Sequence, residues 1–353
     1  PPTEEQLQAM RDINVELHSV TLEPLRAGLA SIRTLWTDLP LEIAFYTRAE
    51  FQQEVDQILN DNHIDLAVSF FMRTAEYVRR RPNLPRILVA EDCRVEYQSR
   101  SSSSARSLHQ RIVRWWETRK LLAYEPEVVN DFDLTTFVSP EDVAAMRDLN
   151  ASASYQVVTN GVDLDRFAYN DDQSSRSGVL FAGKLDVLAN HLMAGSIVRD
   201  IFPMVQVLHK GATLTIAGAN PLSSLRTMLG EGMELHADVP DLVPYLHRYA
   251  VFLHPHHGGS GIQNKVLEAM SAGCAVVTTP SGLQGIDAIH EVHCLIGTSD
   301  TDLADNAARL LGDPDLRQRL ARNARVLMEQ THSWKHVEQQ MFAAITTVLH
   351  TAS

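Results

Sequence analysis

The chain of 353 residues carries a formal net charge of −13, with 44% apolar and 21% charged residues. This composition is ordinary for a globular protein, and the length favours two domains that each bury a core of their own. The acidic balance argues against general nucleic-acid binding, which requires a basic face, and no run approaches the roughly 20 apolar residues that span a bilayer. Because the sequence starts at Pro1 and shows no signal peptide, we expect it to begin inside a longer protein or after processing.

The cysteines, Cys93, Cys274 and Cys294, are too few and too scattered for a disulfide framework or a paired-cysteine metal site. The last two lie in apolar surroundings and are expected to be buried thiols, which suits a reducing compartment, normally the cytoplasm. The cluster His-Pro-His-His at 254–257 raises a zinc interpretation. No partner stands at the usual ligand spacing, so no metal is predicted.

Short apolar strands alternate with amphipathic helices along the chain, a rhythm typical of parallel sheets covered by helices. In the first half we expect strands near 14–21, 64–70, 86–91, 134–138 and 155–159, and helices near 3–11, 49–62, 72–80, 106–129 and 140–149. In the second half we expect strands near 178–182, 212–218, 232–236, 250–254, 274–279 and 294–297. The helices of that half are expected near 189–205, 221–229, 240–248, 262–272, 300–311, 315–329 and 333–351.

A polar, turn-rich stretch, AYNDDQSSRSG at 168–178, separates the two halves. We therefore expect two doubly wound domains that face one cleft. In such sheets ligands bind outside the carboxyl ends of the strands, so the residues that follow the strands are the first candidates for a site.

Two strand ends carry candidate residues. Gly183 allows a sharp turn after the strand near 178–182, and Lys184 then lies at the carboxyl edge, where a solvated charge is the ordinary alternative to a ligand contact. Asn160 and Gly161 follow the strand near 155–159, and a tight turn at a domain junction is the favoured interpretation of that pair from physics alone.

The stretch GGSGIQNKVLEAMSAGCAVVTT at 258–279 combines a glycine-rich start, a helix and a short apolar strand. Ser260 and Gln263 fit a capping box, and Gly273 is well placed to end the helix. A glycine-rich start also lets backbone N–H groups approach an anion, and the start of a helix favours phosphate. The capping and ligand interpretations are both open at this point.

Lys265 and Glu268 are three residues apart, so they share one face of this helix, while Val266, Leu267 and Met270 supply apolar contacts. A cation and a carboxylate suit a ligand with a phosphate and a sugar, because the cation meets the anion and the carboxylate accepts from two hydroxyls. The structural alternative is a surface ion pair worth about a few tenths of a kcal/mol. The neighbouring glycine loop favours the ligand.

Two common nucleotide motifs are not supported by the sequence. The phosphate-binding loop GxxxxGK[ST] is absent. The pair Gly259-x-Gly261 lacks the third glycine of a dinucleotide fingerprint, and no acidic residue ends the following strand.

Five blocks of the sequence resemble, in order, the signature blocks of the retaining glycosyltransferases of family 4. They are NGVD (160–163), FAGKLD (181–186), GSGIQNKVLEAMSAGCAVVTT (259–279), SGLQGI (281–286) and HSW (332–334). More narrowly, the glycine loop and the stretches LVAEDCRVEYQSR (88–100) and RWWETRKLLAYE (114–125) are similar to bacterial sugar transferases of exopolysaccharide systems. The blocks cover most of residues 86–350 and are specific for fold and enzyme class, but not for substrate.

The resemblance implies a GT-B fold. Residues 1–158 would form a Rossmann-like acceptor domain, 159–332 a Rossmann-like nucleotide-sugar domain, and 333–353 a helix that packs back on the first domain. It also implies a nucleoside-diphosphate sugar as donor and no metal or other cofactor. Glu268 would hold the ribose hydroxyls, and Lys184 would meet the diphosphate. The predicted donor-binding set is Gly161, Gly183, Lys184, Asn190, Ser260, Gly261, Ile262, Gln263, Asn264, Lys265, Val266 and Glu268.

The sequence departs from the family pattern in three ways. Ser260 stands where the family has a glutamate that commonly touches the donor sugar, so the sugar's identity cannot be transferred. Asn190 falls near the family's second basic residue, and we infer that Lys265 supplies the missing charge. The first strand, its glycine-rich turn and the next helix of the first domain are expected to be missing before Pro1.

We predict catalytic roles for Lys184 and Lys265, which, with the backbone N–H groups of 261–263, would stabilise the departing diphosphate. The resemblance implies that a diphosphate oxygen takes the acceptor proton, so no nucleophilic carboxylate is required. Asp92 and Arg94 are predicted on the acceptor side, although Asp92 is equally explained as a turn-capping residue. The acceptor would be a glycan, a lipid-linked group or a small molecule.

Two other functions stay open. A catalytically degenerate nucleotide-sugar binding protein is favoured by Ser260 and by the missing first unit. A nucleotide-sugar epimerase would need acid and base carboxylates that the sequence does not reveal.

A basic and aromatic segment at 94–120 stands out in this acidic chain, with Trp115 and Trp116 between its charges and with Glu96 and Glu117 as its acidic residues. It suits peripheral contact with anionic lipid at the inner face of the cell membrane, or a lipid-diphosphate acceptor. A helix with one solvated face and inward tryptophans explains it equally well. Its basic residues are Arg94, Arg100, Arg106, Arg111, Arg114, Arg119 and Lys120.

Overall fold

The computed structural model describes residues 3–33, 37–95, 108–258 and 261–352. The chain divides into two compact units. Unit 1 comprises Pro1–Phe137, Asp142–Val157 and Phe342–Ser353, and unit 2 comprises Val138–Glu141 and Val158–Met341. The main division between Val157 and Val158 lies one residue from the boundary expected from the sequence.

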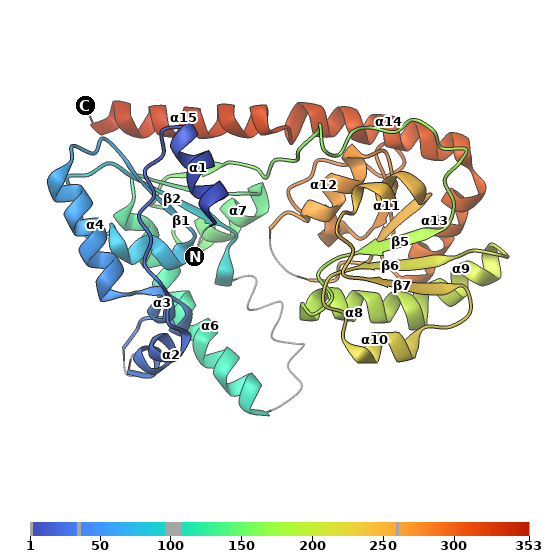
Figure 1. Ribbon diagram of the computed structural model, residues 1–353, viewed down its shortest axis with the longest axis horizontal. Helices are drawn as coiled ribbons and strands as arrows, with labels where there is room; N and C mark the ends of the chain where they lie inside the picture. Colours follow the sequence, from blue (N-terminus) through green and yellow to red (C-terminus); the bar gives the residue numbers. More distant parts are fainter. Residues whose placement is uncertain (1–2, 34–36, 96–107, 259–260, 353) are drawn as a thin grey trace. The chain divides into compact units, whose positions relative to one another are not determined.

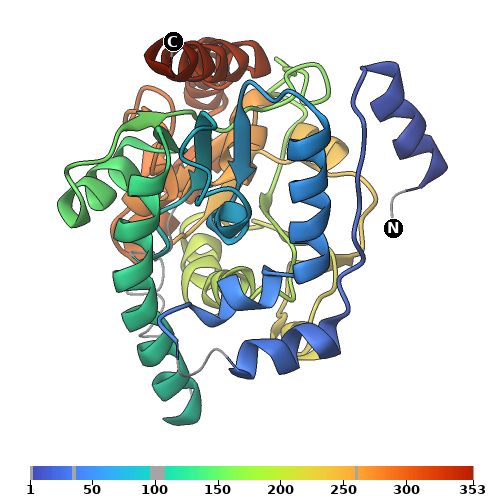
Figure 2. The same cartoon turned by 90° about the vertical axis from the view of Figure 1, so that its left-hand side faces the viewer.

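Unit 1 contains a four-stranded parallel sheet in the order β1-β2-β3-β4. Its central strands β2 and β3 are almost entirely buried, which is why they read as apolar runs in the sequence. Figure 2, which faces this unit, shows α4 and α6 on opposite sides of the strands. The strands are β1 (Ala67–Phe70), β2 (Arg86–Glu91), β3 (Leu134–Phe137) and β4 (Tyr155–Val157). The helices are α1 (Glu4–Asp12), α2 (Pro24–Arg33), α3 (Leu41–Tyr46), α4 (Ala49–Asp61), α6 (Leu108–Val128) and α7 (Pro140–Leu149), with 3₁₀ turns η2 (Met72–Tyr77) and η4 (Val129–Asp131).

The expected strand at 14–21 is wrong. The segment is extended but pairs with no strand, and its apolar side chains Val15 and Leu17 are 43% and 39% exposed. Alternating polarity predicts a strand only when a neighbouring strand accepts its hydrogen bonds, and none does so here among the described residues. The sequence analysis also missed α2 and α3, and the helix expected at 72–80 is the shorter 3₁₀ turn η2.

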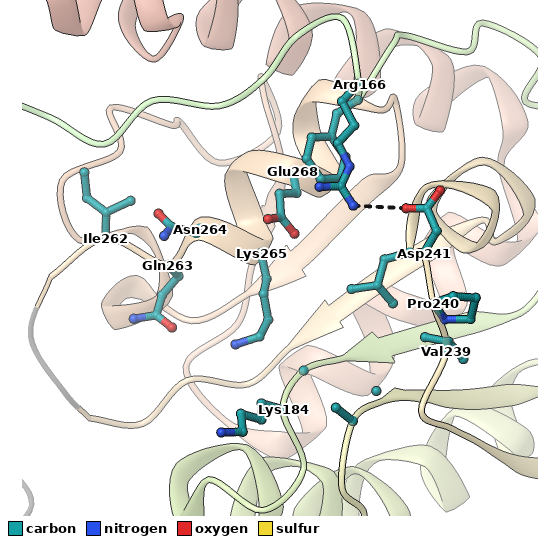
Figure 3. Close-up of a pocket in the computed structure, with 15 residues that line it drawn as sticks. Arg166, Lys184, Val239, Pro240, Asp241, Ile262, Gln263, Asn264, Lys265 and Glu268 are labelled. Carbon is teal, nitrogen blue, oxygen red and sulfur yellow. Dashed lines mark hydrogen bonds and ion pairs between the residues drawn. The ribbon is translucent and has the colours of Figure 1, made fainter. Parts of the chain in front are cut away.

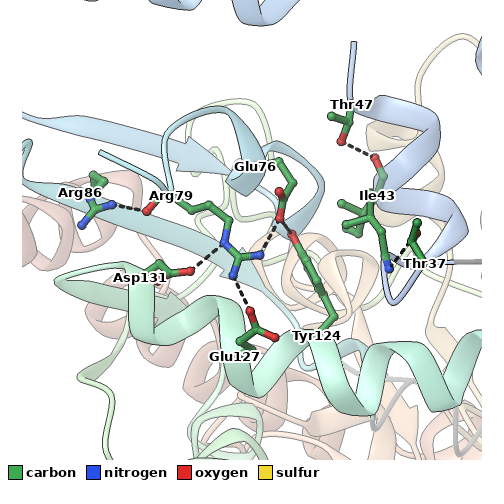
Figure 4. A network of polar contacts seen from close by, with 10 residues as sticks. Thr37, Ile43, Thr47, Glu76, Arg79, Arg86, Tyr124, Glu127 and Asp131 are labelled. Atoms are coloured by element: carbon green, nitrogen blue, oxygen red, sulfur yellow. Dashed lines mark hydrogen bonds and ion pairs between the residues drawn. The ribbon is translucent and has the colours of Figure 1, made fainter. Parts of the chain in front are cut away.

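A charged network around Arg79 holds the helical layer of unit 1 together (Figure 4). The Arg79 guanidinium donates to Glu76 at 2.7 Å, Asp131 at 2.7 Å and Glu127 at 2.9 Å. The Tyr124 hydroxyl donates to the same Glu76 carboxylate at 2.8 Å. Because these side chains come from η2, α6 and η4, the network ties the turn after β1 to the long helix before β3.

Unit 2 contains a six-stranded parallel sheet in the order β10-β9-β8-β5-β6-β7, of which Figure 1 labels β5, β6 and β7. This is the doubly wound order, in which the chain moves outward from β5 on one side and then returns to begin again at β8 on the other. Each strand and helix expected in this half is present. The strands are β5 (Val179–Ala182), β6 (Leu214–Gly218), β7 (Met233–Ala237), β8 (Val251–His254), β9 (Ala275–Thr278) and β10 (Leu295–Ile296).

The helices of unit 2 cover a core in which β5, β6, β8 and β9 are fully buried. The expected helix at 189–205 is one continuous path through α8 (Leu188–Ser196), a π turn η5 (Ile197–Ile201) and α9 (Phe202–Leu208). The others are α10 (Ser223–Met228), α11 (Val243–Arg248), α12 (Asn264–Ser271), the 3₁₀ turn η6 (Pro280–Leu283), α13 (Asp300–Gly312), α14 (Pro314–Thr331) and α15 (Trp334–Ala352).

Helix α15 belongs to both units, because its residues from Phe342 onward are part of unit 1 and its first residues are part of unit 2. A backbone hydrogen bond of 2.8 Å from Val162 N–H to His332 O fixes the turn from which the helix starts. None of the described helices is long and apolar enough to cross a membrane. Cys274 and Cys294 are buried thiols, as expected, and no disulfide links the described cysteines.

Candidate functional site

A pocket of about 590 Å³ opens at the carboxyl end of the unit 2 sheet (Figure 3). Gly183 and Lys184 reach it directly after β5, and Gly218 ends β6 in its wall. The start of α12, which follows β8, forms the opposite wall. Because β5 and β8 are the neighbouring strands at which the winding reverses, this is the crevice where doubly wound sheets bind ligands.

Helix α12 begins without a side-chain cap. Its first residue is Asn264, and the side chain of its N-cap, Gln263, makes no capping hydrogen bond. The expected capping box of Ser260 and Gln263 is therefore wrong, because Ser260 lies too far before the helix; that serine is outside the described residues. Gly273 ends the helix with φ of +76°, as expected. The positive end of the helix dipole thus lies at the pocket, which Gln263, Asn264 and Lys265 line.

Lys265 is a partly buried cation in the wall of the pocket. Burial lowers its pKa, while the Glu268 carboxylate opposes that shift. The two side chains form no ion pair within 4 Å in the described part of the chain, so the surface-pair interpretation does not hold. The Lys265 ammonium instead donates to Asn190 Oδ1 at 3.3 Å. A desolvated ammonium without a directly bonded carboxylate interacts strongly with an anion that enters the pocket.

Glu268 lies one turn further along α12 and lines the same pocket as Arg166 (Figure 3). Burial raises its pKa, and the charges of Lys265 and Arg166 oppose that rise. Arg166 itself pairs with Asp241 at 3.3 Å across the rim of the pocket. A half-buried carboxylate between two cations can accept from vicinal hydroxyls, which is the role that the resemblance implies for Glu268.

Lys184 differs from Lys265 in its surroundings. Its side chain is 61% exposed, and its ammonium lies 3.9 Å from the Asp186 carboxylate. The Asn190 amide donates to Lys184 O at 2.9 Å, which fixes the backbone turn that carries this lysine. Asn190 therefore contacts both lysines, one through its oxygen and one through its nitrogen.

Two glycines give the pocket its room, and backbone contact requires the one at 218. A Cβ at Gly218 would lie 1.8 Å from Gly183 O, so the ends of β5 and β6 could not approach as they do. A Cβ at Gly183 would lie 2.9 Å from Cε of Lys265. The two glycines thus leave room for the lysine side chain to cross the end of the sheet.

Seven residues of the predicted donor-binding set line this pocket, namely Gly183, Lys184, Ile262, Gln263, Asn264, Lys265 and Glu268. Three others, Asn190, Gly261 and Val266, are neighbours of lining residues in space or in sequence and are themselves buried. Gly161 lies apart from the lining, and a Cβ there would stand 2.7 Å from the Trp334 ring. Ser260 is outside the described residues.

The sequence analysis missed the wall of the pocket opposite α12. Part of it follows β7, where the sequence DVPDLV carries polar residues and a proline just after a parallel strand, and part lies a few residues after the NGVD block. The segment after β7 satisfies the strand-end rule that was applied to Lys184, so that signal was present in the sequence. Arg166 and Phe167 follow β4 of the unit 1 sheet, so the rule gave no signal for them. The missed residues are Arg166, Phe167, Gly218, Ala219, Val239, Pro240, Asp241 and Leu242.

The histidine cluster at 254–257 does not form a metal centre in the described residues. No group of three or more His, Cys, Asp or Glu side chains gathers there or elsewhere in the described ranges. His254 and His256 are buried and stack with ring centroids 5.7 Å apart, and His257 is exposed.

The predicted acceptor-side residues lie in unit 1, in the loop that follows β2. The N–H groups of Arg94 and Val95 donate to the two oxygens of Glu125 at 3.2 and 3.0 Å, and Cys93 N–H donates to Asp142 at 3.0 Å. Burial raises the pKa of Glu125 to about 8, although these donors favour its charged form. The backbone of this loop is thus held by two buried acidic side chains, Glu125 and Asp142.

Arg94 and Asp92 both make hydrogen bonds within unit 1. The Arg94 guanidinium is bonded to Glu42 of α3, and Asp92 N–H donates to Ala90 O at 3.1 Å. Of the basic segment at 94–120, residues 96–107 lie outside the described residues. On α6, Trp115 is 63% exposed, and the Lys120 ammonium lies 3.9 Å from the centre of the Trp116 ring.

Residues 173–313 match the model of a protein family described as glycosyl transferases group 1. The matched range includes the strands of unit 2, all of α12 and most of the pocket. This part of the chain is therefore similar to glycosyl transferases group 1. Comparison with curated proteins gives no match.

Solved structures resemble the whole chain in fold. Sucrose-phosphate synthase from Thermosynechococcus elongatus has a TM-score of 0.69 at 18% identity, covering 86% of this chain and 78% of that one. The Anabaena protein HepE in complex with UDP and glucose has a TM-score of 0.70 at 13% identity, covering 98% and 90%. The pneumococcal O-GlcNAc transferase GtfA in complex with UDP and GlcNAc has a TM-score of 0.61 at 14% identity, covering 88% and 60%.

These likenesses confirm the expected fold, in which two parallel-sheet α/β domains match GT-B glycosyltransferases. The domain match and the fold both support a glycosyltransferase. The family number, the stereochemistry, the acceptor and the absence of a metal remain predictions.

Proposed function

We propose that this protein is a retaining, metal-independent glycosyltransferase of family 4. It moves a hexose-type sugar from a nucleoside-diphosphate sugar to a hydroxyl of a glycan, lipid-linked or small-molecule acceptor. Exopolysaccharide assembly in a bacterial cytoplasm is the setting that the sequence blocks favour. Uridine is the base to test first, because the similar structures of HepE and GtfA are complexes with UDP.

One observation carries the proposal. The desolvated Lys265 ammonium, the uncapped start of α12 and the raised-pKa carboxylate of Glu268 line the same pocket at the reversal point of the unit 2 sheet. A nucleoside diphosphate presents an anion and a pair of ribose hydroxyls at a fixed separation, and this arrangement offers one partner for each.

In the proposed reaction these residues stabilise the leaving group, which is the nucleoside diphosphate. The bond from the sugar's anomeric carbon to the diphosphate breaks, a bond from that carbon to the acceptor oxygen forms, and the acceptor proton passes to a diphosphate oxygen. Negative charge gathers on the diphosphate as its bond lengthens. Lys265, Lys184 and the N–H groups at the start of α12 would stabilise that charge, which in a dry site is the largest help a protein gives.

The acceptor side is proposed to include Asp92 and Arg94 in unit 1. The exposed Trp115 and its basic neighbours on α6 would provide peripheral contact with anionic lipid at the inner membrane face. Pelleting with vesicles of phosphatidylglycerol and phosphatidylcholine tests that contact. Binding that needs the anionic lipid and weakens in Trp115→Ala supports it, and equal recovery with neutral vesicles removes it.

The central experiment is a thermal-shift screen of the purified chain against UDP-, GDP- and ADP-sugars, followed by turnover with the donor that binds. A ligand at a hundred times its Kd stabilises by about 2.7 kcal/mol, which a melting curve resolves. Acceptor-dependent release of nucleoside diphosphate that survives EDTA, with the anomeric configuration kept in the NMR spectrum of the product, is the expected result. Binding without acceptor-dependent release would instead indicate the degenerate binding protein, and isomerised donor without acceptor would indicate an epimerase.

A further inference from the structure

His254 is the last residue of β8 and lies next to the pocket without lining it. Its side chain is fully buried, and its ring stacks on those of Phe252 and His256 with centroids 6.0 and 5.7 Å apart. A phenylalanine would satisfy this packing. The two ring nitrogens therefore call for an explanation, since burying polar atoms costs free energy.

The surroundings of His254 fix the position of its proton. Nε2 lies 3.3 Å from Oε1 of Gln263, whereas Nδ1 is buried with no partner among the described residues. A carboxamide oxygen only accepts hydrogen bonds, so Nε2 carries the proton and donates. Burial, followed by the charges of His256 and Lys265, lowers the pKa of His254 to about 3, which keeps the ring neutral.

Gln263 is the N-cap of α12 and lines the pocket two residues before Lys265 (Figure 3). Its side chain could present either a carbonyl oxygen or an amide nitrogen to a bound molecule. The bond from His254 engages the oxygen, so the amide nitrogen and its two hydrogens are what the side chain offers. An oxygen in that place would repel an anion, whereas an N–H donor attracts one.

We propose that His254 is a positioning residue that orients the Gln263 carboxamide so that its nitrogen donates a hydrogen bond to a diphosphate oxygen in the pocket. This inference rests on the proposed function. It adds a neutral donor to the two lysines and the helix start. Asn190 follows the same pattern, because its oxygen and its nitrogen are both engaged by the residues that shape the pocket.

A double-mutant cycle tests the inference through the affinity for UDP, GDP or ADP, whichever the wild-type chain binds, measured by calorimetry. His254→Phe keeps the stacking and removes the donor, and Gln263→Met removes the amide. Each single change should weaken binding of the nucleoside diphosphate about tenfold to a hundredfold, in line with one hydrogen bond to a charged group. Because His254 acts through Gln263, the double variant should bind no more weakly than Gln263→Met alone. Additive losses would overturn the proposal.

Rescue and a neighbouring control separate positioning from a general effect on folding. His254→Gln places an amide N–H close to the former Nε2, so it should recover affinity to within about twofold of wild type, by the same one-bond reasoning. His257→Phe, an exposed change in the same cluster, should leave affinity unchanged. A His254→Gln variant with the melting temperature of the wild type but the affinity of His254→Phe would contradict the role.

The choice of ligand distinguishes the possible hydrogen-bond acceptors. If Gln263→Met weakens the nucleotide-sugar but not the free nucleoside diphosphate, the donor faces a sugar hydroxyl, and the assignment to the diphosphate is wrong. If the wild-type chain binds no nucleoside diphosphate at all, the proposed function fails together with this inference. Wild-type binding with additive single losses removes the inference alone.

Discussion

The two sheets both end in loops that gather charged side chains, but they use those charges in opposite ways. After β2 in unit 1, Glu125 accepts the backbone N–H groups of Arg94 and Val95. The hydrogen-bonding capacity of this side chain is therefore used to hold the loop. After β5 and β8 in unit 2, the Lys265 ammonium donates to a neutral amide and to no carboxylate among the described residues, and the N-cap side chain of the helix beside it makes no capping bond. A carboxyl group engaged by the backbone of its own unit positions a loop, whereas a desolvated cation bonded to a neutral amide marks a site for a ligand.

The largest expected effect concerns Glu125 and the pH dependence of stability. Burial raises its pKa to about 8, above its ordinary value of 4.5, so folding favours the protonated form. Its contribution is complete below about pH 4.5, where both states hold the proton, and is lost as the pH rises toward 8. Relative to Glu125→Gln, which has no proton to lose, the free energy of unfolding of the wild type should fall by about 1.4 kcal/mol per pH unit.

Urea unfolding of both proteins between pH 5 and 8 measures this difference, which accumulates to about 4 kcal/mol by the same relation. Other titrating groups are common to the two chains and cancel. Parallel stability curves would mean that Glu125 is ionised when folded. In that case unit 1 would hold a charged carboxylate at its strand ends, and the contrast with unit 2 would reduce to the number of bonds made.

The next effect is on chemistry in unit 2. Lys265→Ala should lower kcat by roughly two orders of magnitude, because the variant loses the desolvated charge that faces the leaving diphosphate. Steady-state turnover with the donor found in the screen measures it. Lys210→Ala, an exposed lysine between α9 and β6, is the matched control and should behave as wild type. Unchanged kcat in Lys265→Ala would show that the buried cation serves folding and not the reaction.

How far the sequence could lead differs between the two units. In unit 2 the central strands are buried on both faces, so each reads as an apolar run, and every expected strand was found. In unit 1 the segment 14–21 has the alternating polarity of a strand but pairs with no strand among the described residues. The sequence of one segment does not reveal whether a neighbouring strand is present. Helices α2 and α3 carry short apolar patterns that the sequence analysis did not separate from loop.

The site shows the same limit. The α12 wall was predicted because Lys265 and Glu268 share one helix and their spacing fixes their common face. The opposite wall, with Arg166 and Asp241, joins two loops that are 75 residues apart, and only the fold brings them together. His254 was considered as a metal ligand because its type and neighbours were visible, while its bond to Gln263 depends on where β8 ends.

Stability of unit 1 gives a smaller effect. Arg79→Met should lower the free energy of unfolding by about 2 kcal/mol, because it leaves the mostly buried Glu76 carboxylate without its cation. Glu127 and Asp131 are more exposed, and water replaces their share of the network. Urea unfolding monitored by tryptophan fluorescence measures the change. Arg80→Met, at the exposed neighbouring position, should stay within about 0.5 kcal/mol of wild type, and equal losses in both would remove the network from the account of unit 1.

The smallest effect separates the two lysines of the pocket. Lys184 is mostly exposed and lies near Asp186, so water, salt and that carboxylate already screen it. Lys184→Ala should weaken donor binding by only about threefold at low salt, and the difference should vanish near 0.5 M salt, as expected for an exposed ion pair. Calorimetry at two salt concentrations tests this. A loss of tenfold or more that persists in high salt would mean that the donor buries Lys184 as deeply as Lys265, because only a desolvated contact resists screening. In that case the position of a lysine at the strand end would matter more for donor binding than its burial in the free protein.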